Sequence, residues 1–233
     1  MTRPAPRPEP DRARAAVLRQ ALSVGAATGA YGVSFGALSV AAGLSVTQTC
    51  VLSLLMFTGG SQFAFVGVTA AGGAAGAAIA TAGLLGIRNG FYGLAMAPLV
   101  RARGLTRLLA AHFTIDESTA VGSAQQVNHP GRPELVRLGF WSTGVSVFVL
   151  WNTSTVLGAL VGDQLGDPRR YGLDAAAAAA FLALVWPRLA SALPRWVAAG
   201  AIGLALLLVP FTPAGVPVIV AGVFGAAAAW RSP

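Results

Sequence analysis

The sequence contains no lysine, and all 16 of its basic residues are arginine. The phosphate-binding loop of one large class of ATP-driven proteins needs a lysine after its glycines, so this absence excludes that class. The single cysteine, Cys50, excludes an intramolecular disulfide and a cysteine-based metal site. The two histidines, His112 and His129, lie far apart in the sequence and lack companions at metal-ligand spacing. We therefore expect neither a metal nor a cofactor.

Charged residues are also scarce, at 10% of 233 residues, whereas soluble domains carry roughly 25%. Hydrophobic residues make up 55% of the chain, and the mean hydropathy is +0.67. The net charge of +8 comes from arginines that stand mainly at the ends of apolar runs, where membrane proteins place them. The composition predicts an all-α, polytopic helical bundle in a membrane rather than a nucleic-acid-binding protein.

The first 20 residues hold five arginines and four prolines. We expect residues 1–20 to form a disordered basic tail, with the N-terminus on the cytoplasmic side. Residues 21–233 are expected to form a single transmembrane domain. Its apolar runs stand at about 21–42, 46–70, 77–100, 105–127, 138–161, 173–186, 196–210 and 214–230. The last three are shorter than the roughly 20 residues that an untilted span needs, so we expect seven or eight membrane segments.

The second run contains Gly59, Gly60, Ser61 and Gln62 in its middle. Adjacent glycines weaken a helix, and polar side chains at membrane depth need partners. We expect the helix to break here at mid-membrane, which is tolerated where the break is buried in protein or lines a cavity. A half-helix that begins near Gly60 would direct free N–H groups into the cavity and attract a carboxylate. The alternative is a tightly packed helix crossing in which Ser61 and Gln62 are hydrogen-bonded.

A second break is predicted in the third run, at residues 86–90, which carry Arg88 and Asn89. Breaks in neighbouring runs are typical of the discontinuous helices of transporters. A charged side chain at membrane depth costs on the order of 3 kcal/mol, so we expect Arg88 to face protein or a cavity. It could bind an anionic ligand through charge-assisted hydrogen bonds, or form a structural ion pair with Asp116.

The fourth run carries two adjacent carboxylates, Asp116 and Glu117. Adjacent residues on a helix point about 100° apart, so the two cannot face one site equally. We predict that Asp116 faces the site and that Glu117 lies nearer a helix end or a partner surface. Either could carry a coupling proton, and Tyr92 is a further candidate contact. With Arg88 and the N–H groups near Gly60, this set would suit an amino-acid zwitterion between apolar walls.

Three blocks of the sequence resemble the AzlC family of branched-chain amino-acid exporters. The first is Phe57–Ala64, preceded by Ala42–Ser45; the second is Tyr92–Pro98; the third is Phe113–Ser118. The resemblance covers about residues 20–210. It implies a permease that exports Leu, Ile, Val and sometimes Met across the bacterial inner membrane. It also implies pairing with a small AzlD-type membrane subunit, and it would make residues 21–233 a single transport domain.

With no ATP-binding loop, export would be driven by an ion or proton gradient or by the gradient of the substrate itself. Two other classes remain open from the residues. One is a transporter or channel for another small solute, where a channel would show a ring of like groups and no saturation. The other is an intramembrane hydrolase in which Ser61 and His112 form a catalytic dyad.

Overall fold

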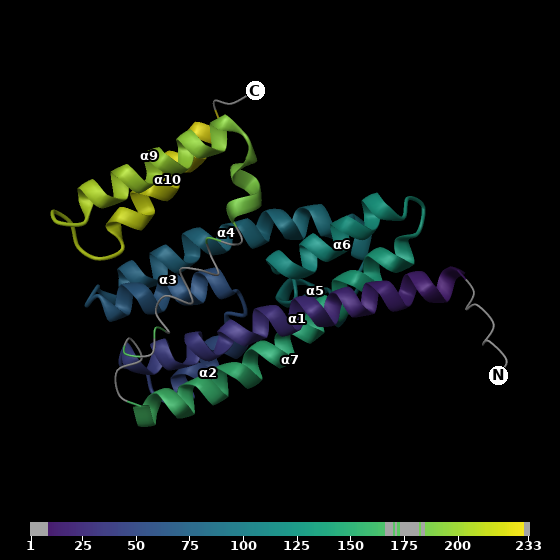
Figure 1. Cartoon of the computed structure of the whole chain (residues 1–233), viewed down its shortest axis with the longest axis horizontal. Helices are drawn as coiled ribbons and strands as arrows, with labels where there is room; N and C mark the ends of the chain where they lie inside the picture. The colour runs from purple at the N-terminus through teal and green to yellow at the C-terminus, as the bar shows by residue number, and fades with distance from the viewer. Residues whose placement is uncertain (1–8, 166–169, 171, 173–181, 183–184, 231–233) are drawn as a thin grey trace. The chain divides into compact units, whose positions relative to one another are not determined.

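The computed structural model describes residues 9–165, 170, 172, 182 and 185–230, and within these residues it contains helices and no strand (Figure 1). The elements are α1 (Glu9–Ala41), α2 (Val46–Leu55), α3 (Gly59–Ala70), α4 (Ala75–Val100), α5 (Leu105–His112), α6 (Asp116–Asn128), α7 (Pro133–Leu165), the short 3-10 helix η2 (Trp186–Ala190), α9 (Ala192–Leu208) and α10 (Val216–Trp230). The all-α prediction is confirmed for this part of the chain. The run predicted at 173–186 lies almost entirely outside it.

Among the described residues, two helices contain stretches that are long and apolar enough to cross a membrane. These stretches are Arg12–Ala41 in α1 and Pro133–Gln164 in α7, with 30 and 32 residues. The helices α2, α9 and α10 contain shorter apolar stretches. The number of membrane segments, seven or eight, stays a prediction.

The chain divides into two compact units, and the division falls within α1, α4 and α7. Unit 1 takes in the described residues of Met1–Gly32 and Arg88–Ser154. Unit 2 takes in Val33–Ile87 and the described residues of Thr155–Pro233. Each unit carries its own part of the polar residues that the sequence singles out.

In unit 1, a stripe of glycines on α1 brings the backbone of this helix close to α7 (Figure 1). A methyl group on Gly29 would lie 2.9 Å from Leu150 Cβ, and one on Gly32 would lie 3.1 Å from the Trp151 carbonyl oxygen. Residues spaced three and four apart share one helix face, so the stripe at Gly25, Gly29 and Gly32 forms one contact surface. These close approaches make the stripe a packing surface between α1 and α7.

A compact apolar cluster holds the other helices of unit 1 together. Met96 and Val100 near the end of α4 pack with Val136 and Phe140 of α7. Phe113, which follows α5, sits edge-on against the ring of Trp141, with 6.0 Å between ring centroids. This cluster fixes the end of α4 and the α5–α6 connection against one helix, which matters because Arg88 lies on α4 and Asp116 on α6.

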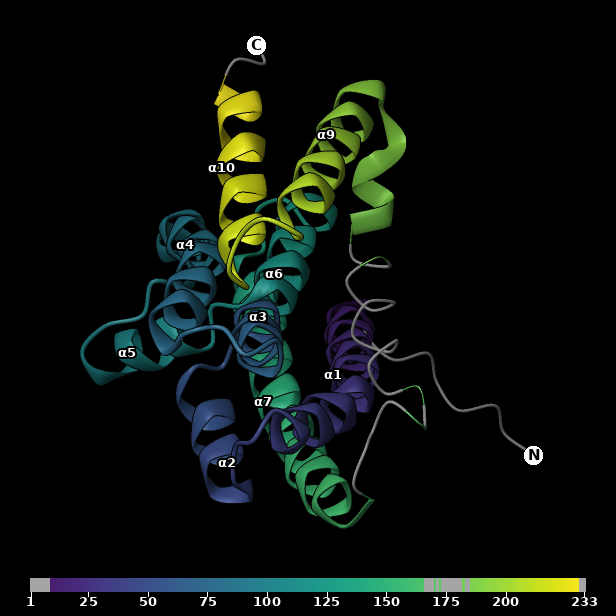
Figure 2. The same ribbon diagram turned by 90° about the vertical axis from the view of Figure 1, so that its left-hand side faces the viewer.

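In unit 2, the same close approach continues between the last residues of α1 and of α7. A methyl group on Gly158 would overlap the carbonyl group of Val33, and one on Gly36 would overlap the carbonyl oxygen of Thr155. In the same unit, α9 and α10 lie side by side (Figure 2), with the ring of Phe224 against Gly200. These contacts leave no room for a side chain at any of the three glycines.

We expect Gly158→Ala to destabilise the protein by about 3 kcal/mol, because the added methyl group meets rigid backbone rather than a movable side chain. The melting temperature of the purified protein in detergent should fall by several degrees. The control is Gly83→Ala on α4, where a methyl group would meet nothing within 4 Å. A Gly158→Ala protein as stable as the Gly83→Ala protein would contradict the packing described.

The structure corrects the prediction that residues 1–20 form a disordered tail. The helix α1 begins at Glu9, so residues 9–20 are helical, and residues 1–8 lie outside the described part. Proline is compatible with the first turn of a helix, where its missing N–H is not needed, and arginine and alanine favour helix. Val17 and Ala21 are 2% and 1% exposed. Their burial adds packing that the charge pattern alone does not reveal.

The prediction of a second helix break at residues 86–90 is also wrong. The helix α4 is continuous from Ala75 to Val100. Gly86 and Gly90 each cost about 1 kcal/mol relative to alanine inside a helix. The surrounding alanines, leucines and methionine favour helix, and Arg88 has a partner for its charge. Glycine therefore weakens this helix without breaking it.

Candidate functional site

The apolar run 46–70 folds as two helices, α2 and α3, separated by Met56, Phe57 and Thr58. Ser45 begins α2 with a capping box: its Oγ accepts from Gln48 N at 3.2 Å, and Gln48 Oε1 accepts from Ser45 N at 2.8 Å. The break falls at the stretch where the sequence predicted one. Its depth in the membrane stays a prediction.

The N-terminus of α3 presents backbone donors that no helical acceptor uses. The helix begins at Gly59, and the Gln62 N–H donates to the Thr58 carbonyl at 3.1 Å. The N–H groups of Gly59, Gly60 and Ser61 precede that bond, and the Thr58 side chain makes no capping bond. Free N–H groups and the helix dipole together favour an anion at such an end.

Three side-chain atoms at this end of α3 have no hydrogen-bond partner among the described residues. They are Thr58 Oγ1, Ser61 Oγ and Gln62 Oε1. Ser61 is 2% exposed and Gln62 is 0% exposed. A buried polar atom without a partner is costly, and a ligand is one way to satisfy it.

The amide nitrogen of Gln62, in contrast, has partners within unit 2. Its Nε2 donates to the Ser53 carbonyl at 3.2 Å and to the Leu52 carbonyl at 3.4 Å. Both carbonyls belong to the last turn of α2, and the Leu52 carbonyl also accepts from the Met56 N–H at 2.9 Å. Gln62 therefore joins the two helices across the break with one end of its amide and leaves its oxygen free. The sequence left open that the Ser61 and Gln62 side chains are both hydrogen-bonded. Of their polar atoms, only Gln62 Nε2 has a hydrogen-bond partner among the described residues.

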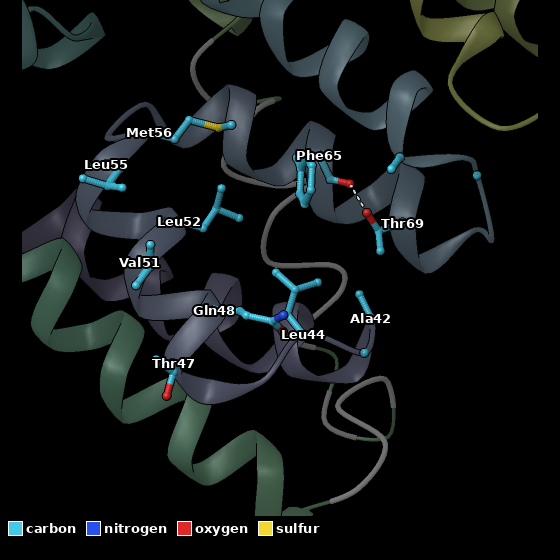
Figure 3. Close-up of a pocket in the computed structure, with 13 residues that line it drawn as sticks. Ala42, Leu44, Thr47, Gln48, Val51, Leu52, Leu55, Met56, Phe65 and Thr69 are labelled. Atoms are coloured by element: carbon cyan, nitrogen blue, oxygen red, sulfur yellow. Dashed lines mark hydrogen bonds between the residues drawn. The ribbon is translucent and has the colours of Figure 1, made fainter.

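A groove of about 830 Å³ runs along α2 and α3 within unit 2 (Figure 3). Leu44, Val51, Leu52 and Phe65 give it a mostly apolar lining, and Met56 links it to the helix break. Thr69 also lines it, but the Thr69 hydroxyl donates to the Phe65 carbonyl at 2.9 Å. The lining contains no charged residue, so the groove suits an apolar group and not a carboxylate.

In unit 1, Arg88 of α4 and Asp116 of α6 form an ion pair. Arg88 Nη2 lies 2.7 Å from Asp116 Oδ2, and Arg88 Nε lies 3.1 Å from both carboxylate oxygens. The Tyr92 hydroxyl donates to Asp116 Oδ1 at 2.9 Å. The Arg88 and Asp116 side chains are 27% and 15% exposed. The structure thus brings three of the predicted site residues together, with the pairing that the sequence allowed for Arg88.

A second helix break, which the sequence reasoning missed, positions Asp116. The run predicted at 105–127 folds as α5 and α6, separated by Phe113, Thr114 and Ile115. The Ile115 N–H donates to Ser118 Oγ at 3.1 Å, and the Thr114 hydroxyl donates to the Ala110 carbonyl at 2.7 Å. Acidic residues are common in the first turn of a helix, so Asp116 and Glu117 are a signal from which this break could have been predicted.

Glu117 lies beside Asp116 in the first turn of α6 but meets a different helix. The Thr28 hydroxyl of α1 donates to Glu117 Oε1 at 3.5 Å, and the Tyr31 side chain interacts with both Thr28 and Glu117. Glu117 was predicted to lie nearer a helix end or a partner surface than Asp116; α6 instead begins at Asp116, and Glu117 follows it in the first turn. Negative charge at this end is also favoured by the helix dipole.

Asn89, the remaining candidate of unit 1, makes no hydrogen bond through its Oδ1 to a described residue. The predicted site residues thus fall in two groups. Arg88, Asn89, Tyr92, Asp116 and Glu117 belong to unit 1, whereas Gly59, Gly60, Ser61 and Gln62 belong to unit 2.

One comparison with known proteins finds a family for the chain. A protein-family model described as "AzlC protein" matches residues 23–165. No curated protein and no solved structure matches the chain. The matched residues include both helix breaks and the Arg88–Asp116 pair.

Proposed function

The chain belongs to the AzlC family, and from this premise we propose that it is a secondary transporter that exports branched-chain amino acids. The family is one of membrane transporters, and the apolar helices of the chain support a membrane location. The finer assignments are part of the proposal: substrates Leu, Ile and Val, the bacterial inner membrane, and a cytoplasmic N-terminus.

The observation that carries the substrate class is the start of α3. Its free N–H groups, with the Ser61 hydroxyl beside them, would receive the carboxylate of an amino acid. The adjoining groove, which Met56 and Leu52 line, would accept an aliphatic side chain. Both features lie in unit 2, so this half of the proposal needs no residue of unit 1.

The Arg88–Asp116 pair would supply the charged elements of transport. An ion pair that exchanges partners as the protein changes conformation is a bistable element of the kind that switching requires. Its two charges cost little while paired and much while apart, so the pair would resist intermediate states. Because the chain has no ATP-binding loop, a proton gradient, an ion gradient or the gradient of the substrate would drive transport. The proposed partner is a small AzlD-type membrane subunit.

A cell-based experiment tests the proposal. Cells with and without the gene are fed a dipeptide that contains valine or leucine, and the free intracellular amino acid is measured. We expect cells without the gene to accumulate more free valine and leucine and to grow more slowly. Equal intracellular levels in the two strains would contradict the proposal.

Ser61→Ala is expected to raise the substrate concentration for half-maximal export of leucine by roughly tenfold. One charge-assisted hydrogen bond contributes about 1.5 kcal/mol or more, and 1.4 kcal/mol is a factor of ten in affinity. The measurement is initial-rate transport in proteoliposomes. Ser23→Ala, on an exposed position of α1, is the control and should leave the value unchanged. An unchanged value for Ser61→Ala would show that the hydroxyl does not contact the substrate.

A further inference from the structure

The two adjacent carboxylates of α6 differ in what holds them. Both oxygens of Asp116 receive hydrogen bonds, from the guanidinium of Arg88 and from the hydroxyl of Tyr92. A carboxylate in a bidentate pair with arginine is held in its ionised form. Asp116 is therefore poorly suited to take up a proton while this pair is intact.

Glu117 is held by hydroxyl groups. Its hydrogen-bonding partners are Thr28 and Tyr31 of α1, and no arginine among the described residues forms an ion pair with it. The ionisable side chains that act on it are Asp116 on α6, Arg88 on α4 and Tyr31 on α1. A hydroxyl can donate to a carboxylate and, after rotation, accept from a neutral carboxyl group. The Glu117 environment can thus satisfy either protonation state.

We propose that Glu117 is the residue that binds and releases the coupling proton, and that Asp116 remains ionised as the counter-ion of Arg88. The inference rests on the proposed transport function and deepens it by naming the coupling ion and its carrier. A hydronium ion gives its proton to a Glu117 oxygen: one O–H bond of the hydronium breaks, one O–H bond forms on Glu117, and a water molecule is left. The neutral carboxyl group then donates to a Tyr31 or Thr28 oxygen, and release to water reverses the step.

Two further buried hydroxyl groups of unit 1, those of Thr143 and Ser146, lie on α7. Ser146 of α7 faces Gly25, which lies one helical turn before Thr28 on α1. Thr143 lies one turn before Ser146 on the same face of α7, and neither hydroxyl has a hydrogen-bond partner among the described residues. Further along α1 and α6, Gln125 Nε2 donates to Gln20 Oε1 at 2.9 Å. These polar groups lie where α1 meets α7 and α6 within unit 1.

The test separates exchange of substrate from its coupling to protons. Proteoliposomes that contain the purified protein are assayed for leucine counterflow at one pH on both sides. They are then assayed for leucine uptake driven by an imposed pH gradient. We expect Glu117→Gln, which mimics the neutral carboxyl group, to retain counterflow within about threefold of the wild type. Its rate of leucine uptake driven by the pH gradient should be at least tenfold lower than that of the wild type.

Asp116→Asn is expected to lose both activities, because it leaves Arg88 without its counter-ion. Tyr31→Phe, a positioning variant, should keep counterflow and shift the pH for half-maximal driven uptake. The control is Glu134→Gln, whose carboxylate is exposed and pairs with Arg132 at 2.8 Å, and it should behave as wild type.

Two results distinguish a failure of the proposed transport function from a failure of the Glu117 assignment. A wild-type protein that shows no counterflow of leucine overturns the proposed function itself. A wild-type protein with counterflow and pH-driven uptake, in which Glu117→Gln keeps the driven uptake, overturns the assignment of the proton to Glu117 alone. Should Glu117→Gln not fold, Glu117→Asp replaces it, with an expected shift in the pH profile and preserved counterflow; an unshifted profile overturns the assignment.

Discussion

Arg88→Ala is expected to abolish leucine export and to destabilise the protein by about 3 kcal/mol. The change leaves Asp116, whose side chain is only 15% exposed, with the Tyr92 hydroxyl and without its opposite charge. Removing one member of a buried ion pair typically costs 3–5 kcal/mol, and the 27% exposure of Arg88 puts this pair at the lower end. Transport in proteoliposomes and the melting temperature of the purified protein give the two readouts.

A double variant separates the structural role of this pair from its role in transport. Arg88→Leu combined with Asp116→Leu removes both charges, so stability should recover to near the wild-type value. We expect export to remain at least a hundredfold reduced, because no charge is left to switch partners. If the double variant is stable and transports normally, the pair is only structural. The matched control removes the exposed pair Arg132–Glu134 and should leave both readouts unchanged.

Gln62→Leu is the second change with a large expected effect. It keeps the size of the side chain but removes the donor to the Ser53 and Leu52 carbonyls and the free oxygen beside the start of α3. The Leu52 carbonyl keeps the Met56 N–H as a donor. Loss of the Gln62 donor from the Ser53 carbonyl costs about 1–3 kcal/mol, and this cost falls on the contact that joins α2 to α3. We expect leucine export to fall at least tenfold and the melting temperature to fall by several degrees.

The control for this change is Gln126→Leu, at an exposed position of α6, which should preserve both stability and export. Gln62→Glu adds a sharper comparison. It places a negative charge beside the α3 N-terminus, where the substrate carboxylate is proposed to bind, so it should inhibit export more strongly than Gln62→Leu. Export by Gln62→Glu at the wild-type rate would contradict an anion site at this position.

The sequence was sufficient to locate the break before α3, because two adjacent glycines and two polar residues interrupt a long apolar run. It also identified Arg88 and Asp116 as a possible pair, since a charge in an apolar segment must find an opposite charge or water. It could not decide between pairing and ligand binding. That choice depends on the relative positions of α4 and α6, and it is Met96 of α4 and Phe140 of α7 that lie against Gly122 of α6.

The errors in prediction have physical causes. Single glycines in α4 were taken as breaks, but an isolated glycine costs too little to interrupt a helix whose neighbours favour it. The break at Phe113–Ile115 was missed because its residues are apolar or uncharged and continue the hydrophobic run. Its signal lies after the break, in the acidic residues that begin α6. The contact of Glu117 with Thr28 joins positions 89 residues apart and could not be read from local pattern.

Leucine counterflow in proteoliposomes tests directly whether the protein is a saturable transporter of branched-chain amino acids. Vesicles that contain the purified protein, alone or with the proposed small subunit, are loaded with unlabelled leucine and diluted into labelled leucine. We expect a transient, saturable accumulation of label that valine and isoleucine compete away and that Arg88→Ala abolishes. No accumulation with either preparation, or uptake that rises linearly with concentration as in a channel, would contradict it.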